Sequence, residues 1–194
     1  LLNPIPFWPP LQLEDGVCVS GMLTPPTADV WASPESLQEE LEQRGYKIDI
    51  RYGNRPYGFV DDDLMGEVPL QQLHDDAMEV LDRRIDATKY LLTEYDFEYF
   101  YGLYKTIDLV HHFFWVQMEE DAEYGDTIER AYRRIDDLIG WLRAEYPETN
   151  ILVCSDHGAQ SRTIDTFQKP YNILDRITRA TPGKPAVLPR GLRR

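Results

Sequence analysis

Positive charge is scarce in this chain of 194 residues. Lysine and arginine together number 20, against 34 aspartate and glutamate residues, and the formal net charge is −14. A surface of this sign repels nucleic acid backbones and anionic lipid headgroups. We therefore expect neither nucleic acid nor an anionic membrane as a main partner. A small phosphate-bearing substrate remains compatible, because bound metal ions reverse the local sign of the charge.

Cysteine and long apolar runs are scarce too. The two cysteines, Cys18 and Cys154, each lie inside a short apolar run, which predicts buried free thiols rather than a disulfide or a metal-binding pair. No run is long and apolar enough to suggest a helix that spans a membrane. We expect a cytoplasmic protein. The sequence does not indicate an oligomeric state.

A short apolar run at residues 151–154 ends abruptly in Ser155, Asp156, His157 and Gly158. This pattern predicts a buried strand of a parallel sheet, which delivers a carboxylate and an imidazole at the edge where open α/β sheets bind ligands. Asp156 and His157 can both ligate a metal, and Gly158 lets the chain turn away. In the alternative interpretation, Asp156 only caps a strand end. A Ser-His-Asp triad is excluded, because three near neighbours in sequence cannot adopt its relay geometry.

A second pair of candidate ligands lies upstream. Asp108 and His112 are four residues apart, so a helix would place them on one face within reach of a common ion. Carboxylate and imidazole ligands suit zinc, and manganese or iron are alternatives. His111 would then point elsewhere, into packing or toward a substrate. His74 lies beside the apolar stripe of another predicted helix, and we expect it to be a solvated surface side chain.

Periodicity predicts helices that alternate with strands. We expect one helix from Ser33-Pro34-Glu35 to Gly45, a long helix opened by Pro69, and a third that is capped by Asp126 or Thr127 and stopped by Pro147. The third helix should bury one stripe, made up of Ile128, Tyr132, Ile135, Ile139, Leu142 and Tyr146. Strands are predicted at residues 16–20, 46–50, 96–104 and 150–154. Such alternation is typical of an α/β fold with a mainly parallel sheet and helices on both faces.

The two ligand-bearing segments, residues 108–115 and 155–158, resemble two metal motifs of the alkaline phosphatase superfamily, in the same order. The branch that they resemble is that of the type I phosphodiesterases and nucleotide pyrophosphatases. Softer similarities lie at residues 16–25 and 132–140.

The resemblance implies an αβα sandwich of the alkaline phosphatase type, incomplete in this chain. Residues 1–180 would be the C-terminal part of a single α/β domain, and residues 181–194 a disordered tail. Asp108 and His112 would serve one divalent ion, and Asp156 and His157 a second, with two zinc ions favoured over manganese. The resemblance also implies metal-assisted transfer of the phosphoryl group of a small phosphate ester or nucleotide to a Thr or Ser. That nucleophile would lie outside this chain, which alone would be inactive.

Two other functions remain open. One is another metalloenzyme of the superfamily, such as a phosphomutase or a sulfatase, because substrate choice depends on loops rather than on the metal core. The other is a catalytically inactive α/β fragment or interaction module in which the same residues are structural. The acidic run Asp61–Asp63 is interpreted as a solvated loop in preference to a cation site.

Overall fold

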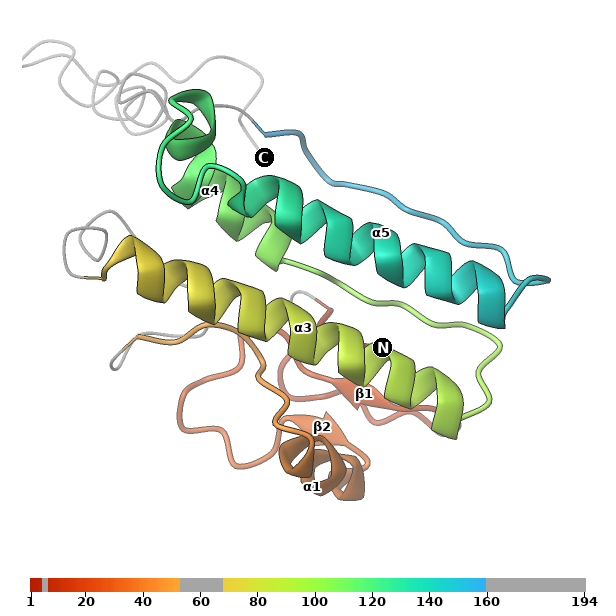
Figure 1. The fold of residues 1–194 in the computed structure, drawn as a ribbon. Helices are drawn as coiled ribbons and strands as arrows, with labels where there is room; N and C mark the ends of the chain where they lie inside the picture. The colour runs from red at the N-terminus through yellow and green to blue at the C-terminus, as the bar shows by residue number, and fades with distance from the viewer. Residues whose placement is uncertain (5–6, 53–67, 160–194) are drawn as a thin grey trace, which may run out of the picture. The chain divides into compact units, whose positions relative to one another are not determined.

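The computed structural model describes residues 1–4, 7–52 and 68–159 of the chain (Figure 1). Residues 1–159 form one compact unit. The Asp61–Asp63 run and the predicted tail at residues 181–194 lie outside the described residues. The part of the domain prediction that concerns residues 160–180 lies outside them as well.

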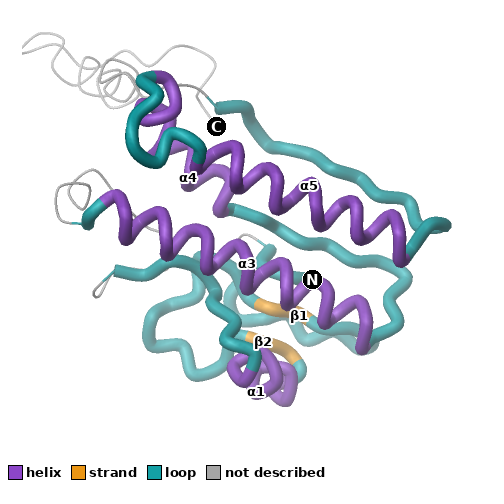
Figure 2. The backbone as a smooth tube through the Cα atoms, viewed as in Figure 1, coloured by secondary structure: helices purple, strands orange, loops and turns teal. Residues whose placement is uncertain are grey.

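Helices dominate the described part of the chain (Figure 2). They are α1 (Glu35–Gln43), α3 (Leu70–Glu94), α4 (Thr106–Glu119) and α5 (Thr127–Glu145). The two strands are β1 (Cys18–Val19) and β2 (Ala32–Ser33), which pair antiparallel with Cys18 opposite Ser33. Helices α1, α3 and α5 were predicted from periodicity and from their Pro, Ser, Thr or Asp starts, and all three are confirmed; α4 supplies the helix that the spacing of Asp108 and His112 required.

Helices α3 and α5 run in the same direction, and three contacts along their length show it. His74 meets Thr127 near their N-terminal ends, Asp82 pairs with Arg134 in the middle, and the Leu92 carbonyl oxygen accepts from the Tyr146 hydroxyl near their C-terminal ends. Helix α4 packs against both of them. The three helices enclose the larger apolar core, whose fully buried members include Ala77, Leu81, Val110, Phe114 and Ala131. Burying each large side chain of this kind stabilises the fold by about 1.5–3 kcal/mol.

A second apolar core lies beneath α1. Its buried members come from the N-terminal segment, from both strands, from α1 and from the C-terminal half of α3: Leu2, Val19, Ala32, Leu37, Leu41 and Leu91. Leu2 makes isolated parallel bridges to Val19 and to Gly102. These bridges attach the start of the chain to the segment that leads into α4.

The strand predictions were mostly wrong for the described residues. The segment 16–20 contains β1, but 46–50 and 96–104 are irregular apart from the bridge at Gly102. Tyr46, Ile48 and Ile50 are buried, but Asp49 between them is buried too, so the burial does not alternate as it would along a half-buried strand. The Ile48 carbonyl oxygen accepts from the side chains of Asn3 and Arg84 instead of from a neighbouring strand. Side-chain donors therefore take the place of a sheet ladder, and the α/β fold shows one short antiparallel pair here instead of a mainly parallel sheet.

The segment at residues 150–154 departs furthest from prediction. It pairs with no strand of the described residues, and Leu152 is 88% exposed. Cys18 is a buried free thiol, as predicted, whereas Cys154 is exposed, so the prediction for Cys154 was wrong. Leu152 and Cys154 are exposed for the same reason: a strand is buried only when neighbouring strands cover it, and no described strand covers this segment. None of the helices in the described ranges combines the length and apolar character that crossing a membrane requires.

His74 is buried, which corrects the prediction of a solvated side chain. It is 5% exposed on α3, and its Nδ1 lies 2.8 Å from the Thr127 hydroxyl oxygen at the start of α5. Its ring packs against Phe114 of α4 and against Tyr124. Burial lowers the pKa of His74, and the nearby Arg130 lowers it further. A neutral imidazole therefore joins the ends of three elements.

We predict that His74 makes the stability of the chain sensitive to acid. Its pKa is lower in the folded protein than in the unfolded chain, where it is about 6.5, so the unfolded chain binds the proton more readily. The stabilisation is present above that pH and is lost as the pH falls below it. Urea unfolding at pH 7.5 and pH 5.5 should show a smaller difference in the free energy of unfolding for His74→Leu than for the unaltered chain. An equal difference in both proteins would contradict this role.

Candidate metal centre

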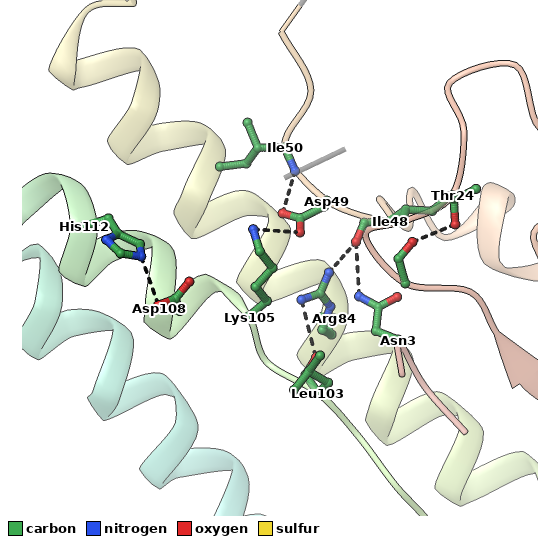
Figure 3. Close-up of polar contacts among 11 residues, drawn as sticks. Asn3, Thr24, Ile48, Asp49, Ile50, Arg84, Leu103, Lys105, Asp108 and His112 are labelled. Atoms are coloured by element: carbon green, nitrogen blue, oxygen red, sulfur yellow. Dashed lines mark hydrogen bonds and ion pairs between the residues drawn. The ribbon is translucent and has the colours of Figure 1, made fainter. Parts of the chain in front are cut away.

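Helix α4 places Asp108 and His112 on one face, as predicted. The His112 Nε2 lies 3.2 Å from the Asp108 Oδ1 across one helical turn (Figure 3). The side chains are 35% and 42% exposed respectively, so both are accessible to a ligand. Asp108 lies in the first turn of α4, where the helix dipole favours a negative charge.

The segment after α5 brings His157 to the same carboxylate. Its Nε2 lies 4.0 Å from the Asp108 Oδ1 and 3.7 Å from the Asp156 Oδ2. The Asp156 side chain is 90% exposed and is the outermost of the four predicted ligands. The structure therefore gathers Asp108, His112 and His157 around one oxygen atom, with Asp156 attached through His157.

A backbone contact determines which ring nitrogen of His157 faces the carboxylate. Its Nδ1 lies 2.8 Å from the Gly158 carbonyl oxygen, which can only accept a hydrogen bond. The Nδ1 therefore carries the proton, and in the neutral ring the Nε2 presents its lone pair toward Asp108. Metal-binding imidazoles commonly have this arrangement, in which a carbonyl holds the remote nitrogen and leaves the other free to ligate.

Contacts within the cluster determine the charges of Asp108 and His157. The hydrogen bond from His112 keeps the pKa of Asp108 below its ordinary value, so the carboxylate is ionised at neutral pH, as a metal ligand must be. The hydrogen bond to the Gly158 carbonyl raises the pKa of His157, and Asp156 raises it further. A metal at this position would compete with a proton for His157 as the pH falls.

The donor types fit a divalent ion, although the donors face one another in this structure. Two imidazoles and carboxylate oxygens are the set that zinc prefers. Across residues 1–4, 7–52 and 68–159, no three such side chains lie in an arrangement that could hold a metal ion. The two histidines are instead directed at the oxygen that they share, Asp108 Oδ1.

A buried polar network fixes the beginning of α4. The Arg84 guanidinium, fully buried on α3, donates to the carbonyl oxygens of Ile48 and of Leu103 (Figure 3). Two residues after Leu103, the Lys105 Nζ lies 3.7 Å from the Oδ2 of the buried Asp49. Arg84 and Asp49 thereby hold the segment that leads directly into Asp108.

Sequence reasoning missed these supporting residues. Asp49 and Lys105 lie in no recognisable motif, and their pairing depends on how distant segments meet. Arg84 lies among the polar residues of an amphipathic helix, and only its burial shows its role. The sequence does hold one signal for the role of Arg84: it lies three residues after Leu81, next to the apolar stripe of α3.

The remaining histidine of α4, His111, packs against aromatic rings. The His111 ring contacts the rings of Trp115 and of Tyr132, and packing was the preferred interpretation for it. Tyr132, which we predicted to be buried, is 50% exposed, because only one side of its ring meets α4. Elsewhere, a pocket of about 400 Å³ is lined by Tyr46, Asp49 and eight other residues, among which none of the four predicted ligands is found.

Residues 3–183 match the family model described as type I phosphodiesterase / nucleotide pyrophosphatase. No curated protein and no solved structure matches the chain. The matched range includes every residue of the cluster around Asp108.

We predict that Arg84 stabilises the fold far more than its neighbour Arg83 does. Arg84→Leu removes the guanidinium donor from the Ile48 carbonyl oxygen, which keeps only the Asn3 side chain, and from the partly buried Leu103 carbonyl oxygen, which should lower the free energy of unfolding by about 2–4 kcal/mol. Arg83, whose side chain is 41% exposed and 4.0 Å from Glu79, is the matched control, and Arg83→Leu should cost about 0.5 kcal/mol or less. Urea unfolding of both variants measures the difference. Similar losses in the two variants would refute the anchoring role of Arg84.

Proposed function

Because the chain belongs to the type I phosphodiesterase / nucleotide pyrophosphatase family, we propose that it is part of a metal-dependent hydrolase of phosphoric esters. Hydrolysis by phosphodiesterases and nucleotide pyrophosphatases is the activity that names the family, and its members are generally metal-dependent. Its substrates are small phosphate esters or nucleotides. We propose further that this chain depends on zinc, with manganese as the alternative.

The observation that carries the proposal is the meeting of two distant segments at one carboxylate. Asp108 and His112 come from α4, whereas His157 comes from the segment after α5. Structural salt bridges do not require an imidazole whose remote nitrogen is held by a carbonyl, but metal ligation does use this device. Asp156, next to His157, supplies a further carboxylate.

In the proposed site, Asp108, His112, Asp156 and His157 hold divalent metal ions. Such ions neutralise charge on the phosphoryl group and orient it for attack. The chain's own residues prepare this site. Arg84 and Asp49 hold the beginning of α4, His112 keeps Asp108 ionised, and the Gly158 carbonyl orients His157. The mainly parallel sheet of the alkaline phosphatase type belongs to the same proposal.

We place the nucleophile of the reaction outside this chain. The hydroxyl nearest in sequence to the ligands is that of Ser155, which donates to the His157 carbonyl oxygen and so is not paired with a base that could activate it. The second candidate function is an inactive interaction module. It is favoured by one observation, that no three metal-binding side chains in the described ranges are arranged to hold an ion.

Metal binding distinguishes the two functions. We predict that the chelator-stripped chain binds zinc, and that Asp108→Asn and the double variant Asp156→Ala/His157→Ala each weaken binding at least about tenfold, since each removes a ligand. Calorimetry measures the affinity. The control is Asp136→Asn, which removes an exposed carboxylate from α5 outside the cluster and should leave zinc affinity unchanged.

Equal affinity in all four proteins would place the metal elsewhere and would favour the interaction module. Absence of zinc and manganese binding in the unaltered chain would show that these four residues do not form a site in it.

We also predict that this chain does not hydrolyse phosphodiesters by itself. With zinc or manganese, hydrolysis of bis(4-nitrophenyl) phosphate should not exceed that of the metal ion alone, because we place the activated hydroxyl outside this chain. Release of nitrophenolate, followed by absorbance, measures the rate. Turnover that Ser155→Ala abolishes would place the nucleophile within the chain and would contradict this part of the proposal.

A further inference from the structure

The pocket of about 400 Å³ is lined by Trp31, by residues of α1 and α3, and by the irregular segment 46–51. Its volume lies within the range that is usual for small-molecule sites in proteins, about 300–1,000 Å³. None of the four predicted metal ligands contributes to the lining, so the pocket is separate from the candidate metal centre. Three features of its lining indicate the kind of molecule that fits it.

The first feature is a buried apolar surface. Its members, each 9% exposed or less, are Trp31, Tyr46, Ile48, Ile50 and Val80. Asp49 is buried among them, but its carboxylate accepts from the Ile50 amide and lies 3.7 Å from the Lys105 Nζ (Figure 3). The charge of Asp49 is therefore compensated within the protein, and this surface can take the hydrocarbon part of a ligand.

The second feature is a buried hydrogen-bond donor without an acceptor. The Trp31 backbone amide donates to the Gln38 Oε1, but the Trp31 indole N–H makes no hydrogen bond with any residue that the structure describes. Stacking on Tyr46, with the ring centroids 5.6 Å apart, holds the indole in place. Because buried polar groups are nearly always hydrogen-bonded, we expect this N–H to meet an oxygen atom of a molecule that enters the pocket.

The third feature is a pair of carboxylates that have neutral partners. Glu42 accepts at 3.0 Å from the side-chain amide of Gln38, the same side chain that holds the Trp31 backbone. Asp76 accepts from the Tyr52 hydroxyl at 2.9 Å. Neither carboxylate forms an ion pair with a residue that the structure describes. Both can therefore accept a charge-assisted hydrogen bond from a cationic group of a ligand, which is stronger than a neutral one.

The positive side chains of the lining are already engaged. The Lys47 Nζ lies 2.6 Å from a carboxylate oxygen of Glu79, which is outside the lining. Arg51 is not free either. A ligand that carried only a negative charge would meet Glu42 and Asp76 without compensation, so a group of positive charge is needed beside its oxygen acceptor.

We propose that this pocket binds a small zwitterion with an apolar side chain, of the class of the aliphatic α-amino acids. Its ammonium group meets the carboxylates of Glu42 and Asp76, and its carboxylate accepts from the Trp31 indole N–H. Its side chain lies against the buried aliphatic part of the lining. The inference does not rest on the proposed function, because the pocket shares no residue with the Asp108 cluster.

The test compares L-leucine with three molecules that each lack one of its groups. 4-Methylpentanoate lacks the ammonium group, 3-methylbutylamine lacks the carboxylate, and glycine lacks the apolar side chain. Each is titrated into the chelator-stripped chain of 194 residues, and binding is followed by calorimetry and by the NMR signal of the Trp31 indole N–H. That signal is identified by its absence from Trp31→Phe, a variant that keeps an aromatic ring without the indole N–H.

We expect L-leucine to bind and to shift the Trp31 signal, and each of the other three molecules to bind at least about tenfold more weakly. Glu42→Gln/Asp76→Asn should weaken L-leucine about tenfold and leave 4-methylpentanoate unchanged, because only the ammonium group loses its partners. Trp31→Phe should weaken L-leucine and leave 3-methylbutylamine unchanged. The matched control is Glu39→Gln/Asp75→Asn, at exposed carboxylates of α1 and α3 outside the lining, which should bind L-leucine normally.

Three results would overturn the inference: no binding of L-leucine, equal affinity for L-leucine and a molecule that lacks one of its charged groups, or binding that leaves the Trp31 signal unchanged. All three are measured on the unaltered chain, so they do not depend on whether a variant folds. Urea unfolding of each variant shows whether a loss of binding is a loss of fold. None of these results concerns zinc affinity at the Asp108 cluster, so this inference and the proposed function fail separately.

Discussion

A single buried guanidinium governs how the described part of this chain is assembled. Arg84 comes from the middle of α3 and donates to carbonyl oxygens of two segments distant in sequence, at Ile48 and Leu103. Burying this charge is unfavourable unless its donors are paired, and the Arg84 Nε has no partner among the described residues, so the guanidinium depends on its two carbonyl contacts. The contact fixes the segment before α4, and thereby the position of Asp108. The candidate metal centre is consequently built on the most buried part of the molecule, although its own atoms are partly exposed.

The site combines a helix that packs into the core, α4, with an irregular segment that makes few buried contacts. Helix α4 packs its apolar side, with Val110 and Phe114, into the core and presents its ionic side outward. His157 arrives on an irregular segment whose apolar side chains are exposed. The electrostatics favour the meeting, since an ionised Asp108 attracts a His157 whose pKa is raised. Attraction of this kind between exposed groups is weak by itself.

Prediction from sequence succeeded where the information is local. Proline, serine or threonine at helix starts and apolar residues at steps of three and four correctly gave α1, α3 and α5, and the i, i+4 spacing correctly placed Asp108 against His112 on α4. Strands were harder, because a strand is defined by its neighbours. Tyr46, Ile48 and Ile50 are buried, yet Asp49 is buried between them and side chains satisfy the Ile48 carbonyl. The burial of His74 and of Asp49, and the exposure of Cys154, depend on tertiary contacts that no short pattern encodes.

The exposed path from the end of α5 to Gly158 has a consequence for the order of events at the site. Leu152 and Val153 contribute little buried area, so detaching this segment from α4 requires far less free energy than unfolding the three-helix core. Whatever binds both Asp108 and His157 must therefore also hold the segment down. Occupancy of the site and local order of residues 151–158 are thermodynamically linked. A ligand that binds both Asp108 and His157 therefore also stabilises the attachment of this segment to α4.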